Sequence, residues 1–158
     1  MSVAFRRESD EDHKEPRFEL PLPPGPNLVT LRGLRLIEAR HAELQGALDR
    51  AEGDAAEAVR RELRYWSTRM TTAEIAPPPP EGEVGIGSHV VFRLNGKRRS
   101  LDIVGADEAD PASDRIGFAA PLAQALIGGA AGDWVDFNGR SEAIEILDVA
   151  AIPDEEQR

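Results

Sequence analysis

Apolar residues recur at intervals of three and four in two neighbouring stretches of the chain. The first stretch comprises Leu34, Ile37, Leu44, Leu48 and Ala51, with His41 interrupting the seam, and the second comprises Ala56, Val59, Leu63, Trp66, Met70 and Ala73. This spacing is typical of a coiled-coil seam. Thr30, a good N-cap residue, precedes the first stretch. Because only a short turn separates the stretches, the pattern predicts an antiparallel coiled-coil hairpin over residues 28–76.

The hydrophobic period changes to two after the four consecutive prolines of the predicted linker, residues 77–82. The segments HVVFRLNGKRRSLDIV and DWVDFNGRSEAIEIL each carry Asn-Gly between alternating runs, which predicts two β-hairpins. Between them, RIGF favours a short strand, and Pro121 to Ile127 favour a short helix ended by glycines. Residues 83–152 are therefore predicted to form a small antiparallel sheet with one short helix, so the fold class is α+β.

The two ends of the chain carry little apolar sequence. Residues 1–27 are charged and then proline-rich, and we interpret them as a solvated, disordered tail. The alternative for this tail is docking through Phe18, Leu20 and Leu22. Residues 153–158 are predicted to be a frayed acidic tail.

Charge and composition narrow the classes of function. The chain of 158 residues has a net charge of −10, and residues 77–158 carry 7 basic and 15 acidic residues, net −8. This balance argues against a protein that coats nucleic acid and suits a basic protein partner. The chain has no cysteine, which excludes thiolate zinc sites, and its three histidines are far apart. Without a long apolar run or a signal-peptide core, we expect a cytoplasmic protein with no membrane partner.

The predicted turn of the helical hairpin, GALDRAEGDAAEA, is rich in acids. Asp54 and Glu57 have the spacing of a capping box, with Asp54 as N-cap of the second helix and Glu57 at its third position. The same two carboxylates are also candidates for metal chemistry, because hard cations prefer oxygen ligands. The sequence alone leaves both interpretations open.

Three segments carry a resemblance to a known family. LVTxxG at residues 28–33, IVGADEAD at 103–110 and PLAQALIGG at 121–129, followed by GD, resemble the GreA/GreB transcript-cleavage and elongation factors of bacterial RNA polymerase. The resemblance covers about residues 28–149. It implies that the coiled coil enters the polymerase secondary channel, while an FKBP-like C-terminal domain grips a coiled coil of the largest subunit at the channel rim.

The resemblance also implies roles for particular residues. Gly53-Asp54-Ala55-Ala56-Glu57 matches the start of the family's tip motif, so Asp54 and Glu57 would help to hold a catalytic Mg²⁺ in the polymerase active centre. The next four family positions differ here. The implied factor is a monomer without a cofactor or metal of its own. It is not an enzyme, and assists the polymerase's own hydrolysis of backtracked RNA.

Two further sets of residues are implied as contacts. Phe118, Pro121 and Leu122 would contribute to polymerase binding, although Gly117 and Ala119 replace a serine and an aspartate that the family uses there. The alternative for the apolar members is the domain core. Arg60, Arg61 and Arg64 are candidates for contact with the RNA 3′ segment; their alternative is a solvated helix face paired with acids.

Hairpin length selects among the functions that the resemblance implies. From Thr30 to Glu52 there are 23 residues, or ~35 Å of helix. The family's cleavage factors have arms longer by roughly three turns, about 16 Å. We therefore expect an elongation factor that modulates the secondary channel or competes for it, with weak or no stimulation of cleavage, similar in length to Rnk-like relatives. The alternatives are a true cleavage co-factor and an FKBP-like peptide-binding module with a coiled-coil handle.

Overall fold

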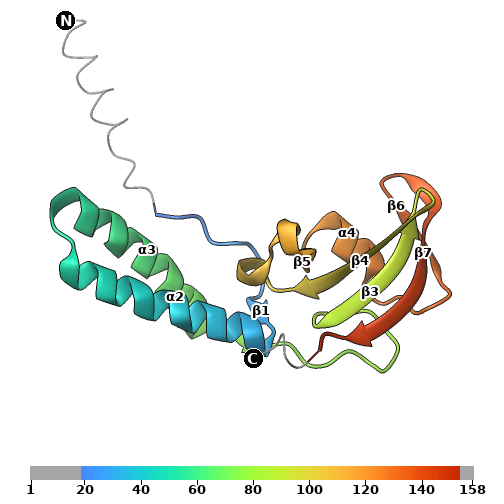
Figure 1. The fold of residues 1–158 in the computed structure, drawn as a ribbon, viewed down its shortest axis with the longest axis horizontal. Coiled ribbons are helices and arrows are strands. Elements are labelled where there is room, and N and C mark those ends of the chain that lie inside the picture. The colour runs from blue at the N-terminus through green and yellow to red at the C-terminus, as the bar shows by residue number, and fades with distance from the viewer. Residues whose placement is uncertain (1–18, 154–158) are drawn as a thin grey trace, which may run out of the picture.

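The computed structural model describes residues 19–153, which form a helical hairpin beside a small sheet domain (Figure 1). Of the two predicted tails, 1–27 and 153–158, residues 1–18, which include Phe18, and residues 154–158 lie outside the described residues. The elements of the hairpin are β1 (Leu28–Val29), α2 (Leu31–Arg50), α3 (Gly53–Thr72) and β2 (Glu74–Ile75). None of the helices in the described part of the chain is long and apolar enough to cross a membrane.

Helices α2 and α3 contain 20 residues each and pack side by side (Figure 1). As predicted, Thr30 is the N-cap of α2, where its hydroxyl accepts a hydrogen bond from the Gly33 N–H at 3.0 Å. The predicted seam is the face on which the helices meet: Ile37 and Leu44 of α2 and Ala56 of α3 are buried. Most of the stability of such a hairpin comes from burial of this apolar seam, since helix propensity alone is weak.

A short parallel pair of strands, β1 and β2, closes the base of the hairpin, and sequence reasoning missed it. Leu28 pairs with Glu74 and Val29 with Ile75. Beside the pair, Asn27 is buried, and its side-chain amide donates to the Arg69 carbonyl at 2.8 Å and to the Thr72 hydroxyl at 3.1 Å. The start of α2 and the end of α3 are thus tied together outside the helices themselves.

The second module is a five-stranded sheet in the order β5-β4-β3-β7-β6. Its elements are β3 (Ser88–Leu94), β4 (Lys97–Val104), β5 (Arg115–Gly117), α4 (Pro121–Leu126), β6 (Trp134–Phe137) and β7 (Arg140–Ala151), with 3₁₀ turns at Ala106–Glu108 and Pro111–Ser113. Both predicted β-hairpins are present. Asn95-Gly96 has φ of 53° and 77°, and Asn138-Gly139 has φ of 54° and 79°. Positive φ at both central residues is what a tight two-residue β-turn requires.

The α+β class is confirmed, but the prediction of a purely antiparallel sheet is wrong. Strand β5 pairs with β4 in parallel, with Ile116 opposite Ile103. The cause is the connection between them: the chain leaves β4, passes through the two 3₁₀ turns and returns to run in the same direction. A hairpin turn would have made the pair antiparallel, and no Asn-Gly signal stands there.

The core of this module lies between one face of the sheet and α4 (Figure 1). It comprises Val84, Val90, Phe92, Leu101, Ile103, Ala123, Leu126, Ile144 and Ile146. Helix α4 begins with proline, as predicted, and ends where Gly128 takes φ of 90° and the Gly129 N–H donates to the Leu126 carbonyl at 3.0 Å. The opposite face of the sheet carries charged residues and Trp134, which is exposed.

Candidate functional site

The tip of the hairpin does not have the capping box that the sequence predicts. The N-cap of α3 is Glu52, whose side chain makes no capping hydrogen bond, and Asp54 is the second residue of the helix. The reason is Gly53: its φ of 59° turns the chain into α3 two residues earlier than an Asp54 cap would allow, with Glu52 as the N-cap. The interpretation of Asp54 as N-cap is therefore wrong. Its exposed carboxylate lies in the first turn, where it meets the positive end of the helix dipole.

Glu57 forms ion pairs with arginines on its own helix. Its carboxylate is 3.5 Å from Arg60 Nη1 and 3.8 Å from Arg64 Nη2. Asp54 and Glu57 are three residues apart and so share one side of α3. Among the described residues, no group of three histidines or carboxylates could hold a metal ion. Two carboxylates at this spacing can supply part of a coordination shell for Mg²⁺, and the other ligands would have to come from a partner.

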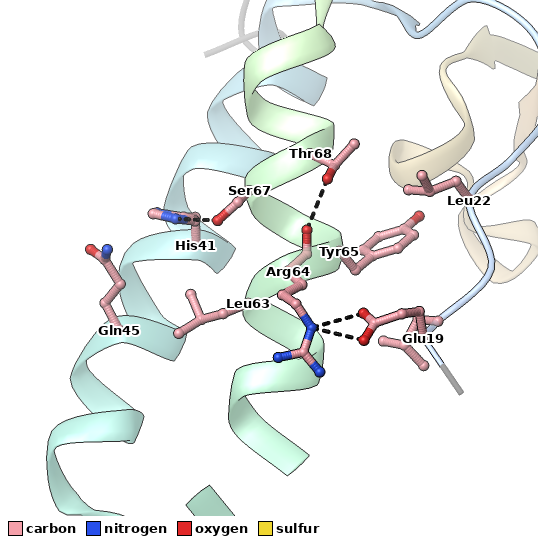
Figure 2. Close-up of a pocket in the computed structure, with 10 residues that line it drawn as sticks. Glu19, Leu22, His41, Gln45, Leu63, Arg64, Tyr65, Ser67 and Thr68 are labelled. Carbon is pink, nitrogen blue, oxygen red and sulfur yellow. Dashed lines mark hydrogen bonds and ion pairs between the residues drawn. The ribbon is translucent and has the colours of Figure 1, made fainter. Parts of the chain in front are cut away.

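Arg64 also binds the segment that precedes the hairpin. Its Nε donates to both carboxylate oxygens of Glu19, at 2.8 and 2.9 Å (Figure 2). This hydrogen bond raises the pKa of Arg64 and lowers the pKa of Glu19. The sequence predicts a disordered tail over residues 1–27, but the described part of it, residues 19–27, does not fit that prediction, because Glu19 is bound to α3 and Asn27 is buried.

The segment 19–22 and the two helices enclose an open pocket of about 580 Å³ (Figure 2). His41 of α2 faces Ser67 of α3 across the seam, with 3.0 Å between Nε2 and Oγ. His41 is therefore a packed, hydrogen-bonded residue of the seam. Of the three candidate RNA contacts, Arg60 and Arg64 are paired with acids, as the solvated-face alternative expects. Arg61 Nε is buried without a hydrogen-bond partner in the described part of the chain.

A buried polar cluster joins the hairpin to the sheet domain. Arg69 of α3 donates from Nε to the Asp107 carboxylate at 2.6 Å, and both side chains are less than a tenth exposed. The Tyr65 hydroxyl donates to the other oxygen of Asp107 at 2.5 Å. Burial, then the hydrogen bond to Asp107, raises the pKa of Tyr65 to about 12. A paired, hydrogen-bonded charge of this kind fixes the orientation of two modules more firmly than it stabilises them.

The neighbouring Glu108 makes a second set of contacts with the start of α2. Its carboxylate accepts hydrogen bonds from the Thr30 hydroxyl and, at 3.0 Å, from Arg32 Nη1. Gly33 and Gly105 allow this close approach: a Cβ on Gly33 would lie 2.8 Å from Glu108 Oε1, and one on Gly105 only 2.5 Å from the Leu28 carbonyl oxygen. The motifs LVTxxG and IVGADEAD thus meet in space. Sequence reasoning noted both motifs but gave the contact no role.

The three candidate polymerase-binding residues lie together at the start of α4. Pro121 is exposed at its first position, while Phe118 and Leu122 are half-buried and pack against the core. The Phe118 carbonyl accepts a hydrogen bond from Gln124 Nε2 at 2.7 Å, which holds the approach to the helix. The core interpretation of Phe118 and Leu122 accounts for their buried part, and Pro121 is the accessible member of the three.

Comparison with known proteins finds one matching family model and several relatives that carry the same family name. Residues 79–151 match the family model described as "Transcription elongation factor, GreA/GreB, C-term". The chain is 36% identical over 121 residues to transcription elongation factor GreA of Mycoplasma mycoides, covering 70% of this chain and 75% of the relative. It is 31% identical over 138 residues to GreA of Helicobacter pylori, covering 75% and 84%.

Other relatives match over shorter stretches or at lower identity. GreB of Neisseria meningitidis is 36% identical over 99 residues, and the chain spans 60% of its length. Among solved structures, transcription factor Gfh1 has a TM-score of 0.40 at 20% identity, covering 82% of this chain and all of that one. A GreA/GreB factor from Nitrosomonas europaea has a TM-score of 0.39 at 19% identity, covering 80% and 99%. From the family model and the GreA relatives, the chain belongs to the GreA/GreB family of transcription elongation factors.

Proposed function

We propose that this protein binds bacterial RNA polymerase in the cytoplasm and acts at the secondary channel, with little or no stimulation of transcript cleavage. The sheet domain would seat on the channel rim around Pro121, and the hairpin would enter the channel. The protein would not be an enzyme by itself.

The length of the hairpin carries this proposal. Each helix has 20 residues, which at ~1.5 Å per residue gives an arm of about 30 Å. Metal ligation tolerates errors of only ~0.2 Å, so a carboxylate that stops a helical turn short contributes nothing. A factor with such an arm would occupy the channel and compete with longer factors for it.

The exposed Asp54 favours the second candidate, a true cleavage co-factor. Because Asp54 caps nothing, the fold alone does not require a carboxylate at this position. In this version Asp54 and Glu57 would hold part of the Mg²⁺ shell, and the ion would activate the water that attacks the RNA phosphate. Glu57 would first have to exchange its contacts with Arg60 and Arg64 for the ion.

A cleavage assay on a backtracked polymerase complex separates the two candidates. For the short-arm factor, the wild type should cleave RNA no faster than polymerase alone, although it binds the complex. Seven residues added to each arm should move the tip ~10 Å deeper while keeping the seam. Cleavage that appears only in lengthened variants and is lost with Asp54→Asn would support a limit of reach. Strong cleavage by the unmodified protein, abolished by Asp54→Asn, would support the co-factor instead.

The polymerase seat needs its own test. Pro121→Ala combined with Leu122→Asp should weaken binding to core polymerase in a pull-down. Gln45→Ala, on the exposed side of α2, is a matched control that should bind normally. Full binding by the double variant, with its circular dichroism unchanged, would contradict the proposed seat.

A further inference from the structure

The outer face of the sheet, opposite the core, carries a solvent-exposed tryptophan, Trp134. Trp134 on the edge strand β6 is 55% exposed, and its strand neighbours Val135 and Phe137 pack against the core instead. The sheet register then places residues in a row across four strands. Trp134 pairs with Glu145, Glu145 with Arg93, and Arg93 with Arg98. At ~4.8 Å per strand, Trp134 and Arg98 lie about 14 Å apart along this row.

A strained bulge opens a pocket beside Trp134. The pairing of β6 with β7 shifts register between Val135 and Phe137. Within the bulge, Glu142 takes φ of 49°, a left-handed conformation that residues other than glycine rarely adopt, and its N–H donates to Asp136 Oδ1 at 2.9 Å. The pocket has a volume of about 430 Å³, and Arg93 and Arg140 contribute to its wall. Strain and bulges of this kind concentrate at binding sites, where they re-aim side chains.

Positive charge collects at this end of an otherwise acidic domain. Of the six Lys and Arg residues in 83–153, all except Arg115 lie in the β3–β4 hairpin or at the start of β7: Arg93, Lys97, Arg98, Arg99 and Arg140. Of the acids near this pocket, Glu145 is paired with Arg93 at 2.6 Å, whereas the exposed carboxylates of Asp136 and Glu142 form no ion pair within the described residues. Lys97, Arg98 and Arg140 are exposed and have no ion pair within residues 19–153. These three cations outnumber the two unpaired acids, Asp136 and Glu142, so this end of the sheet carries a small positive balance that favours an anionic ligand.

The chemistry around Trp134 distinguishes between two kinds of anionic partner. A protein interface would surround the tryptophan with further apolar side chains. Here Trp134 is the one large exposed apolar side chain of this face within the described residues, and Arg93, Arg140 and Glu142 contribute charged groups to the pocket beside it. A lone aromatic ring flanked by cations is the arrangement that binds a single nucleic-acid strand, with a base stacked on the ring and phosphates on the cations.

We propose that this face, with Trp134 and Arg98 in its cross-strand row and Arg140 in the pocket wall beside Trp134, binds single-stranded nucleic acid. A base stacks on Trp134, and the backbone runs along the cations at the β3–β4 turn. A duplex is a poor ligand, because its bases are already stacked and offer no free face. The proposal is independent of the hairpin and its reach, since the two surfaces lie at opposite ends of the molecule (Figure 1).

Tryptophan fluorescence tests the proposal at the site itself. The chain has two tryptophans, so Trp66→Phe leaves Trp134 as the one reporter. Unlabelled single-stranded RNA and DNA oligonucleotides of about 12 nucleotides should quench the fluorescence of Trp134 in a saturable manner. Quenching by either RNA or DNA supports the site, and the type of oligonucleotide that binds more tightly identifies the natural strand. The double variant Arg60→Ala/Arg61→Ala is the control for binding at the hairpin, and it should leave this quenching unchanged.

Binding of the same oligonucleotides, labelled for anisotropy, gives the energetic test. Trp134→Ala should weaken binding about tenfold, the loss of one stacked base, and Trp134→Phe should retain most of the affinity. Arg98→Ala/Arg140→Ala should lower the salt slope by about 1.4. The proposal fails if saturating oligonucleotide leaves Trp134 unquenched, or if Trp134→Ala binds like wild type. It also fails if a duplex or an oligoglutamate peptide quenches equally well, since the latter would indicate an acidic protein partner.

Discussion

The contact between Arg69 and Asp107 gives the most direct test of how the two modules are held together. Asp107→Ala removes the carboxylate and leaves the Arg69 guanidinium buried, with its side chain only 6% exposed. Breaking a buried ion pair in this way costs about 3 kcal/mol or more, because the remaining charge has lost its compensation. With a urea m-value of about 2 kcal/mol/M, the loss lowers the unfolding midpoint by roughly 1.5 M.

The positions of the two tryptophans show where the loss occurs. Trp66 lies on α3 and is in edge-to-face contact with Tyr65, with 5.0 Å between ring centroids, whereas Trp134 lies in the sheet domain. Single-tryptophan variants, Trp134→Phe and Trp66→Phe, therefore report each module in turn. With Asp107→Ala, the Trp66 transition should fall to lower urea and separate from the Trp134 transition.

A double variant is the control for this test. Arg69→Met/Asp107→Leu removes both charges and should return to within about 1–2 kcal/mol of wild type, since replacing a buried pair by apolar residues is often close to neutral. An unchanged Trp66 midpoint in Asp107→Ala would refute the reasoning. So would equal losses in the single and double variants, because the penalty would then not arise from an unpaired charge.

Three further predictions follow from particular contacts. Gly105→Ala should destabilise the protein by about 1–3 kcal/mol in urea unfolding, since its Cβ would press on the Leu28 carbonyl. Gly46→Ala, whose Cβ would make only an ordinary contact 3.7 Å from Arg50 Nη1, should instead stabilise α2 by up to about 1 kcal/mol. Asp54→Ala should change stability by no more than about 1 kcal/mol, the helix-dipole term, and Asp54→Ser should give no rescue; a clear rescue by serine would restore the N-cap interpretation. The single tyrosine should titrate at about 12 by tyrosinate absorbance and at a lower pKa in Asp107→Ala. Because its folded pKa is raised, its stabilising contribution is complete below pH ~10 and is lost as the pH rises toward about 12, a slope absent from Tyr65→Phe.

Much of the fold follows from local sequence signals. The 3-4 spacing from Leu34 to Ala73 predicted both helices, Thr30 predicted the start of α2, and the Asn-Gly pairs predicted both tight turns. These signals work because each depends on neighbours within a few residues. The parallel β4–β5 pair and the two-residue strands at the hairpin base depend on contacts between distant segments, and no local pattern marks them.

The candidate site was less predictable. Asp54 has the residue type and spacing of a cap, but the left-handed Gly53 moves the start of α3 so that Glu52, two residues earlier, is the N-cap. The partners of Arg69 and Glu108 lie 38 and 78 residues away, so burial of these charges could not be read from the sequence. The signal available was the pair of family-like motifs: Gly33 leaves room for the Glu108 side chain, and Gly105 for the Leu28 backbone.

The β1–β2 pair at the hairpin base has a mechanical consequence. Backbone hydrogen bonds of 2.9 Å from Glu74 to Asn27 and from Ala76 to Val29 clamp both ends of the hairpin at one place. The hairpin is then fixed at its base and free at its tip. The lateral displacement of such a tip by thermal motion increases steeply with the length of the arm. A short arm therefore reaches less deeply but holds its tip in a more precise position. Matched changes in length at the free end leave the clamp untouched, which makes reach a property that can vary without refolding the rest of the molecule.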